Sequence, residues 1–245
     1  MFSTMLREWR ALRGMSQLDL ALGADVSTRH VSFIESERSK PSTEMVLRLA
    51  EALDLPLRER NAMLVAAGFA PQFGDSTWQS AEMAEVRRAA ELLLAAHEPY
   101  PAIVLDMAFN VLDANPPAMG MIGATPDLLG QVNLVDLVYG PGPVRESIVN
   151  WTEVAEYLLH RMREGVRRHG PQSAIGAVLR RAMGQPGASE LSIVRVNWGG
   201  SVLLPLEFRM NGEVTRWFTT VTSFGAPQDA MAEEITIEQF HPDAG

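Results

Sequence analysis

The sequence predicts two domains: an all-helical N-terminal domain of five helices, followed by an α+β domain with an antiparallel sheet. Three observations support this fold class. Short helices with clear caps fill the first seventy residues, a linker with proline and glycine follows at 71–76, and β-rich runs flank a helical stretch after Pro99. A chain of 245 residues can bury two cores. The expected boundaries are 1–71, a linker and connecting helix at 72–98, and 99–242.

The N-terminal helices are predicted from their caps and apolar spacing. The first ends at Gly14, the second runs from Gln17 to about Leu22 behind Ser16, and the third runs from Thr28 to about Glu35 behind Ser27. Ser42 caps a fourth helix, and Pro56 begins a fifth that fades at Gly68. Two short helices joined by a turn that contains glycine form a helix-turn-helix pattern.

The rest of the chain is predicted to contain both helices and strands. A helix with an apolar stripe is expected from Gln79 to His97, packed on its own domain or acting as a connector between domains or subunits. Residues 101–106 and 110–114 form a hairpin, and Asn115 caps the helix that follows. Longer helices are expected at 150–168 and 173–183, and strands at 202–210, 214–223 and 234–240, with Asn211-Gly212 as a turn.

Several residues in the first domain match those of a known family. Ser16-Gln17, Leu20-Ala21, Val26-Ser27, Glu35 and Pro41-Ser42 stand where the repressor-type helix-turn-helix proteins, often called the XRE family, have equivalent residues. The domain therefore resembles the DNA-binding domain of phage lambda repressor and Cro. The resemblance implies a sequence-specific, DNA-binding transcription regulator of bacterial type.

Physical chemistry assigns roles within that motif. The second helix of the motif enters the major groove with its first residues toward base edges, so base contacts are predicted at Thr28, Arg29, His30 and Ser32. Phosphate contacts are predicted at Gln17, Arg38, Ser39 and Lys40. Glu35 is expected to cap or pair within the helical bundle rather than to touch DNA.

The charge distribution decides whether DNA is a plausible partner. The formal net charge of −9 argues against nucleic acid at first. Residues 1–71, however, carry nine basic and nine acidic side chains, and the remaining residues carry twelve and twenty-one. A neutral DNA-binding domain predicts weak non-specific affinity and a shallow dependence of affinity on salt.

The second domain also matches a family. Its segments PYPAIVLDMAFNVLDAN, SIVNWTEVAEYLLHRMR and RWFTTVTSFGAPQDAMAEEITIEQFHP resemble the ligand-binding domain of the MmyB-like transcription regulators, and the order of elements resembles a PAS fold, a five-stranded antiparallel sheet with helices over one face. The resemblance implies a small, hydrophobic or fatty-acid-like ligand. Candidate pocket residues are Asn150, Trp151, Phe208, Trp217 and Phe218, although aromatic residues at such spacing also suit an ordinary core. Trp217 and Phe218 point to opposite faces of their strand, and the sequence leaves open which face is inward.

Other functions find less support in the sequence. The five histidines lack metal-ligand spacing, no cysteine is present, and HExxH, P-loop and GxSxG motifs do not occur, so neither an enzyme, a metal site nor a cofactor is expected. The absence of a long apolar run and of cysteine favours a cytoplasmic protein without a membrane partner. We expect a homodimer on a pseudo-palindromic operator. The alternative is a second domain that serves only dimerisation or protein interaction.

Overall fold

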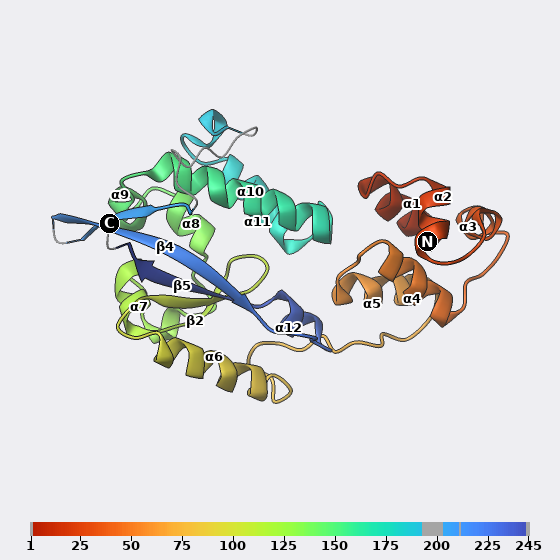
Figure 1. Ribbon diagram of the computed structural model, residues 1–245, viewed down its shortest axis with the longest axis horizontal. Coiled ribbons are helices and arrows are strands. Elements are labelled where there is room, and N and C mark those ends of the chain that lie inside the picture. Colours follow the sequence, from red (N-terminus) through yellow and green to blue (C-terminus); the bar gives the residue numbers. More distant parts are fainter. Residues whose placement is uncertain (1, 193–202, 211, 244–245) are drawn as a thin grey trace.

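The computed structural model describes residues 2–192, 203–210 and 212–243, and it separates into a helical domain and an α+β domain (Figure 1). The helical domain contains five helices, as predicted: α1 (Phe2–Leu12), α2 (Gln17–Gly23), α3 (Thr28–Glu35), α4 (Thr43–Ala52) and α5 (Leu57–Ala66).

The predicted caps define the helix starts of the first domain. The side chains of Ser16, Ser27 and Ser42 each accept a hydrogen bond from the third residue of the helix that they precede. Ser16 also forms a reciprocal capping box with Asp19. Gly14, at φ +65°, ends the first helical segment in the left-handed conformation that glycine adopts without strain. Local sequence therefore determines these boundaries.

The α+β domain is built on a five-stranded antiparallel sheet in the order β2-β1-β5-β4-β3. Its strands are β1 (Ala102–Leu105), β2 (Val111–Ala114), β3 (Leu206–Met210), β4 (Glu213–Ser223) and β5 (Thr236–Pro242). The first strand pairs with the last, so the two ends of the domain meet in the centre of the sheet. The predicted antiparallel sheet is confirmed.

Helices cover both faces of this sheet. The inner face packs against α7 (Pro116–Ile122), α8 (Leu134–Tyr139), α9 (Pro143–Ser147), α10 (Trp151–His169) and α11 (Ala174–Met183). The outer face packs against α6 (Ala84–Ala96), which lies below the sheet in Figure 1. Short 3₁₀ turns at Pro126–Leu128 and Ala188–Glu190 and the helix α12 (Ala230–Glu234) complete the domain. The helix predicted at 79–97 therefore packs on its own domain.

Three predicted boundaries differ from the structure. The helix predicted from Gln79 begins at Ala84, because Arg87 donates to the carbonyls of Trp78 and Ser80 and folds that segment back while Trp78 is buried. The last strand begins at Thr236 rather than Glu234, because Asp229 caps a short helix, α12, that extends to Glu234. The strand predicted from Val202 begins among the described residues at Leu206, and Val202 and Asn211 lie outside those residues.

Asn115 joins three elements through its buried side chain. Its Oδ1 accepts hydrogen bonds from the backbone N–H groups of Ala102 (3.0 Å) and Ala118 (3.1 Å). Its Nδ2 donates to the carbonyls of Tyr100 (2.8 Å) and Leu94 (3.3 Å). The predicted cap of α7 thus also connects β1 with the end of α6.

We expect Asn115→Ala to lower the free energy of unfolding by about 2–4 kcal/mol, because it removes a cap and leaves buried backbone groups without partners. Urea denaturation would measure this loss. The matched control is Gln131→Ala, at an exposed side chain, which should change stability by less than about 0.5 kcal/mol. Equal effects of the two changes would contradict the assigned role.

Candidate DNA-reading surface, ligand cavity and domain interface

Helix α3 presents the residues predicted to read DNA. Ser27 caps the helix, Arg29 is exposed, and Thr28, His30 and Ser32 are half-buried. The opposite side of the helix inserts Val31 and Ile34 into the core of the domain. In Figure 1, α3 lies at the side of the helical domain that is farthest from the sheet, so the second domain leaves this surface uncovered.

The basic loop after α3 folds back onto the same helix. The backbone N–H groups of Arg38 and Ser39 both donate to the carbonyl of Phe33, at 2.8 and 3.2 Å. The guanidinium groups of Arg29 and Arg38 lie 5.1 and 5.9 Å from the centre of the Phe33 ring. The ring therefore brings a predicted base contact and a predicted phosphate contact together, and Lys40 is exposed beyond them.

Glu35 has the structural role that was expected. It is buried and forms two hydrogen bonds with Arg10, at 2.7 and 3.0 Å, and it accepts a third from the side chain of Gln17 at 2.7 Å. Burial raises the pKa of Glu35, but the hydrogen bonds from Arg10 and Gln17 together lower it by more than burial raises it. The net shift of the pKa is therefore downward. The predicted phosphate contact Gln17 thus holds α2 against the end of α3.

An apolar cavity of about 70 Å³ lies between the inner face of the sheet and its helices. Of the five predicted pocket residues, Phe208 lines this cavity. Most of the other lining side chains are aliphatic and come from α7 to α10, including Ile122, Leu134, Val138, Val144, Ile148, Val154 and Leu158. Sequence reasoning missed these residues because aliphatic side chains at helical spacing look like any core.

The other four predicted pocket residues do not line this cavity, although Trp151 and Trp217 pack against the core around it. Asn150 connects the start of α10 to β3 through hydrogen bonds with Pro205 and Glu207, and the indole of Trp151 donates to the carbonyl of Val138 at 2.8 Å. Trp217 packs against the inner core, where its indole donates to Thr215. Phe218 points to the outer face and stacks on His241, with ring centres 4.9 Å apart.

A buried ion pair separates this cavity from a second hollow. Glu238 lines the apolar cavity and accepts a hydrogen bond of 2.5 Å from Arg161, which lines the cleft between the two domains. The guanidinium of Arg161 lies 4.9 Å from the Phe109 ring centre and 5.6 Å from that of Tyr157. One signal in the sequence points to Glu238, because strand alternation places this acid on the same face as the buried Phe240.

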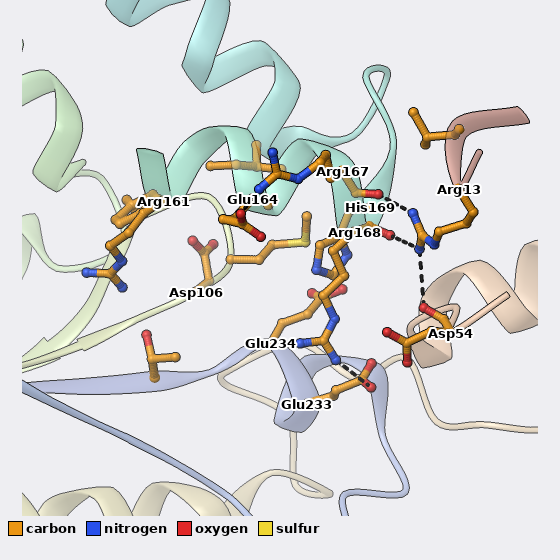
Figure 2. Close-up of a pocket in the computed structure, with 16 residues that line it drawn as sticks. Arg13, Asp54, Asp106, Arg161, Glu164, Arg167, Arg168, His169, Glu233 and Glu234 are labelled. Atoms are coloured by element: carbon orange, nitrogen blue, oxygen red, sulfur yellow. Dashed lines mark hydrogen bonds and ion pairs between the residues drawn. The ribbon is translucent and has the colours of Figure 1, made fainter. Parts of the chain in front are cut away.

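The cleft between the domains has a volume of about 620 Å³ and is lined mainly by charged side chains (Figure 2). At its edge Arg13 of the helical domain donates to the carbonyls of Arg167 and Arg168 in the last turn of α10. The same guanidinium donates to the carbonyls of Leu53 and Asp54 at the end of α4. Arg13 therefore joins the carboxyl ends of two helices, where the helix dipoles favour a cation.

The acidic helix α12 makes the second contact between the domains. Glu234 forms a two-pronged ion pair with Arg58 of α5, at 2.9 and 3.0 Å. Glu233 accepts a hydrogen bond of 2.8 Å from the backbone N–H of Leu57, at the start of the same helix. Burial raises the pKa of Glu234, and Arg58 only partly offsets that rise.

His169 lies at the end of α10 beside these contacts. Its Nδ1 is buried and has no hydrogen-bond partner within residues 2–192, 203–210 and 212–243. Burial lowers the pKa of His169 to about 4, and the charges of Arg168, Arg58 and Arg13 lower it in the same direction. The imidazole is therefore neutral at pH 7.

Comparison with known proteins assigns the chain to a family. Residues 6–60 match a helix-turn-helix family model, and residues 86–244, more than half of the chain, match the MmyB-like transcription regulator ligand binding domain. The chain belongs to the MmyB-like transcription regulators. No curated protein sequence matches it. One solved structure, described as an RNA-binding light-oxygen-voltage receptor, is 13% identical with a TM-score of 0.28, and the match covers 98% of this chain and 58% of that one.

As an MmyB-like regulator, the protein is a DNA-binding transcription regulator with a helix-turn-helix domain. Within the described part of the chain, no group of three or more histidine or acidic side chains is arranged to hold a metal ion. None of the helices in those residues is long and apolar enough to cross a membrane.

We expect Arg29→Ala to relax sequence preference at one base pair, since a two-pronged contact to guanine contributes about 1–3 kcal/mol of discrimination. Lys40→Ala is the matched comparison: it should weaken binding to all sequences alike and lower the slope of log affinity against log salt by about one. Selection of bound DNA from a random pool, followed by salt titrations, would measure both. Unchanged sequence preference in Arg29→Ala would exclude the base contact.

The pKa of His169 predicts a loss of stability in acid. Between pH 6.5 and about 4 the unfolded chain binds a proton that the folded chain does not, so the free energy of unfolding falls as the pH is lowered through this range. Denaturant titrations from pH 7 to 4 should show a smaller fall for His169→Gln than for the unsubstituted protein. The raised pKa values of Glu59 and Glu234 act in the opposite direction in both proteins. Parallel pH profiles for the two proteins would contradict this role of His169.

Proposed function

We propose that this protein is a ligand-controlled transcription regulator, in which a small molecule bound in the apolar cavity alters the placement of the DNA-binding domain. The observation that carries the proposal is the path of α10. Val154, Tyr157 and Leu158 on its first turns line the cavity, and the carbonyls of Arg167 and Arg168 in its last turn hold Arg13 of the DNA-binding domain. One continuous helix of 19 residues therefore reaches from the cavity to the domain interface.

A ligand controls such a regulator only through a difference in its affinity for two arrangements of the domains. The interface is suited to two arrangements, because its contacts are ion pairs and hydrogen bonds at the edge of an open cleft rather than a continuous apolar core. A shift of α10 by a fraction of an ångström would change the geometry at both carbonyls that bind Arg13.

The DNA-bound form is proposed to be a homodimer. Two copies of α3, placed about one helical turn of DNA apart, would read the two halves of a pseudo-palindromic operator. The neutral DNA-binding domain supports this arrangement, because two sets of specific contacts would supply affinity that bulk electrostatics does not. No chemical step forms part of this function.

A substitution that fills the cavity can imitate a ligand and test the coupling. Val154→Phe adds a ring at the start of α10, and we expect it to change operator affinity by fivefold or more, the lower end of typical coupling between sites. Adding Arg13→Ala should abolish that change. Fluorescence anisotropy with operator DNA selected from a random pool would measure all four combinations.

The matched control is Leu92→Phe on α6, where a side chain that is 64% exposed lies outside the cavity. Circular dichroism would establish that each variant is folded. If Val154→Phe leaves operator affinity unchanged in a folded protein, the second domain does not control DNA binding through this cavity, and dimerisation or protein interaction becomes its better assignment.

A further inference from the structure

The apolar cavity has one strongly polar end. Twelve of its fifteen lining side chains are aliphatic or phenyl groups, and the others are Tyr157, Thr219 and Glu238. Glu238 is the one ionisable carboxyl among them and is only 3% exposed. Burying a carboxylate beside an apolar space is costly unless its oxygens find partners. What a ligand offers to Glu238 therefore decides which ligands the cavity accepts.

One oxygen of Glu238 has a partner, and the other is available. Oε1 accepts the hydrogen bond from Arg161, and no residue in the described part of the chain donates to Oε2. A carboxylate has about four acceptor positions on its two oxygens, so a single donor leaves it far from satisfied. The space that Glu238 lines is the place from which another donor can approach.

The charge balance restricts what that donor can be. Arg161 neutralises Glu238, but it lines the cleft between the domains rather than the cavity. An anionic group in the cavity would meet Glu238 first and be repelled at short range in a region of low dielectric constant. A cation would have to give up its hydration shell to enter the cavity, and it would gain little in return, because Glu238 is already neutralised by Arg161. A neutral donor gains a charge-assisted hydrogen bond without either cost.

We propose that the cavity binds a small uncharged molecule that is apolar except for one hydroxyl or amide N–H group, which donates a hydrogen bond to Glu238. This inference rests on the proposed ligand-binding function and names its ligand class. The volume of about 70 Å³ sets the size: it holds about five water-sized groups. Glu238 is thus a specificity-determining residue for the ligand.

Four small probes of matched size test the proposal on the full-length protein. Pentan-1-ol and butyl methyl ether are isomers that differ in the presence of a donor, and pentanoate and pentylammonium carry opposite charges. We expect pentan-1-ol to bind about tenfold more tightly than the ether, the range of a hydrogen bond to a charged acceptor, and more tightly than either ion. Isothermal titration calorimetry and shifts in melting temperature would measure the four dissociation constants.

Two variants separate the hydrogen bond from the charge. Glu238→Gln leaves Arg161 without its counter-charge, so it should reverse the selectivity and admit pentanoate. The double variant E238L/R161M removes both charges, and it should bring the alcohol and the ether to within about twofold of each other. The matched control, R181M/D136L, removes an exposed ion pair outside the cavity and should keep the tenfold preference.

The outcomes distinguish this inference from the proposed function. Equal binding of the alcohol and the ether, or tighter binding of either ion, would overturn the assigned ligand class while the cavity remains a binding site. Binding of none of the four probes would count against the cavity itself and so against both proposals. If Glu238→Gln fails to fold, the double variant, which leaves no unpaired charge, still decides the question.

Discussion

The arrangement of this molecule depends on the guanidinium group of Arg13. The carboxyl ends of α4 and α10 would otherwise face each other with unpaired carbonyls and with dipoles of the same sign. Arg13 donates to two carbonyls of each helix, and its charge offsets both dipoles. The same side chain lies over the ring of Trp9, whose edge approaches Gly170 closely enough that a Cβ there would lie 3.3 Å from it. One residue of the DNA-binding domain thereby holds the carboxyl end of the longest described helix of the other domain.

The charges of the two domains are complementary at their contact although the whole chain is acidic. The excess of acidic residues lies after residue 71, and two of those acids, Glu233 and Glu234, bind the start of α5 and Arg58. Ion pairs of this kind contribute little net stability, because desolvation offsets most of their attraction. They do specify geometry. A polar interface between two stable cores can therefore change its arrangement without unfolding either domain.

Arg161 and Glu238 together separate the inner cavity from the cleft between the domains. Because Arg161 lies on α10, this helix borders both spaces. Arg161 belongs to the cleft and Glu238 to the cavity, so the ion pair between them belongs to both spaces. Two turns further along α10, Arg168 reaches Glu233 of α12, which also binds α5. A series of short contacts therefore runs from the wall of the cavity to the DNA-binding domain.

The sequence by itself determined the elements whose signals are local. Ser16, Ser27 and Ser42 cap their helices because a serine hydroxyl satisfies nearby backbone donors wherever the chain turns into a helix, and strand alternation placed Trp217 and Phe218 on opposite faces. The sequence could not say which face was inward, nor find Glu238, Arg161 or the contacts of Arg13. Those contacts join residues that are at least 40 positions apart in the chain. Only the tertiary structure decided them, because burial and pairing are set by what packs opposite a side chain and not by its neighbours in sequence.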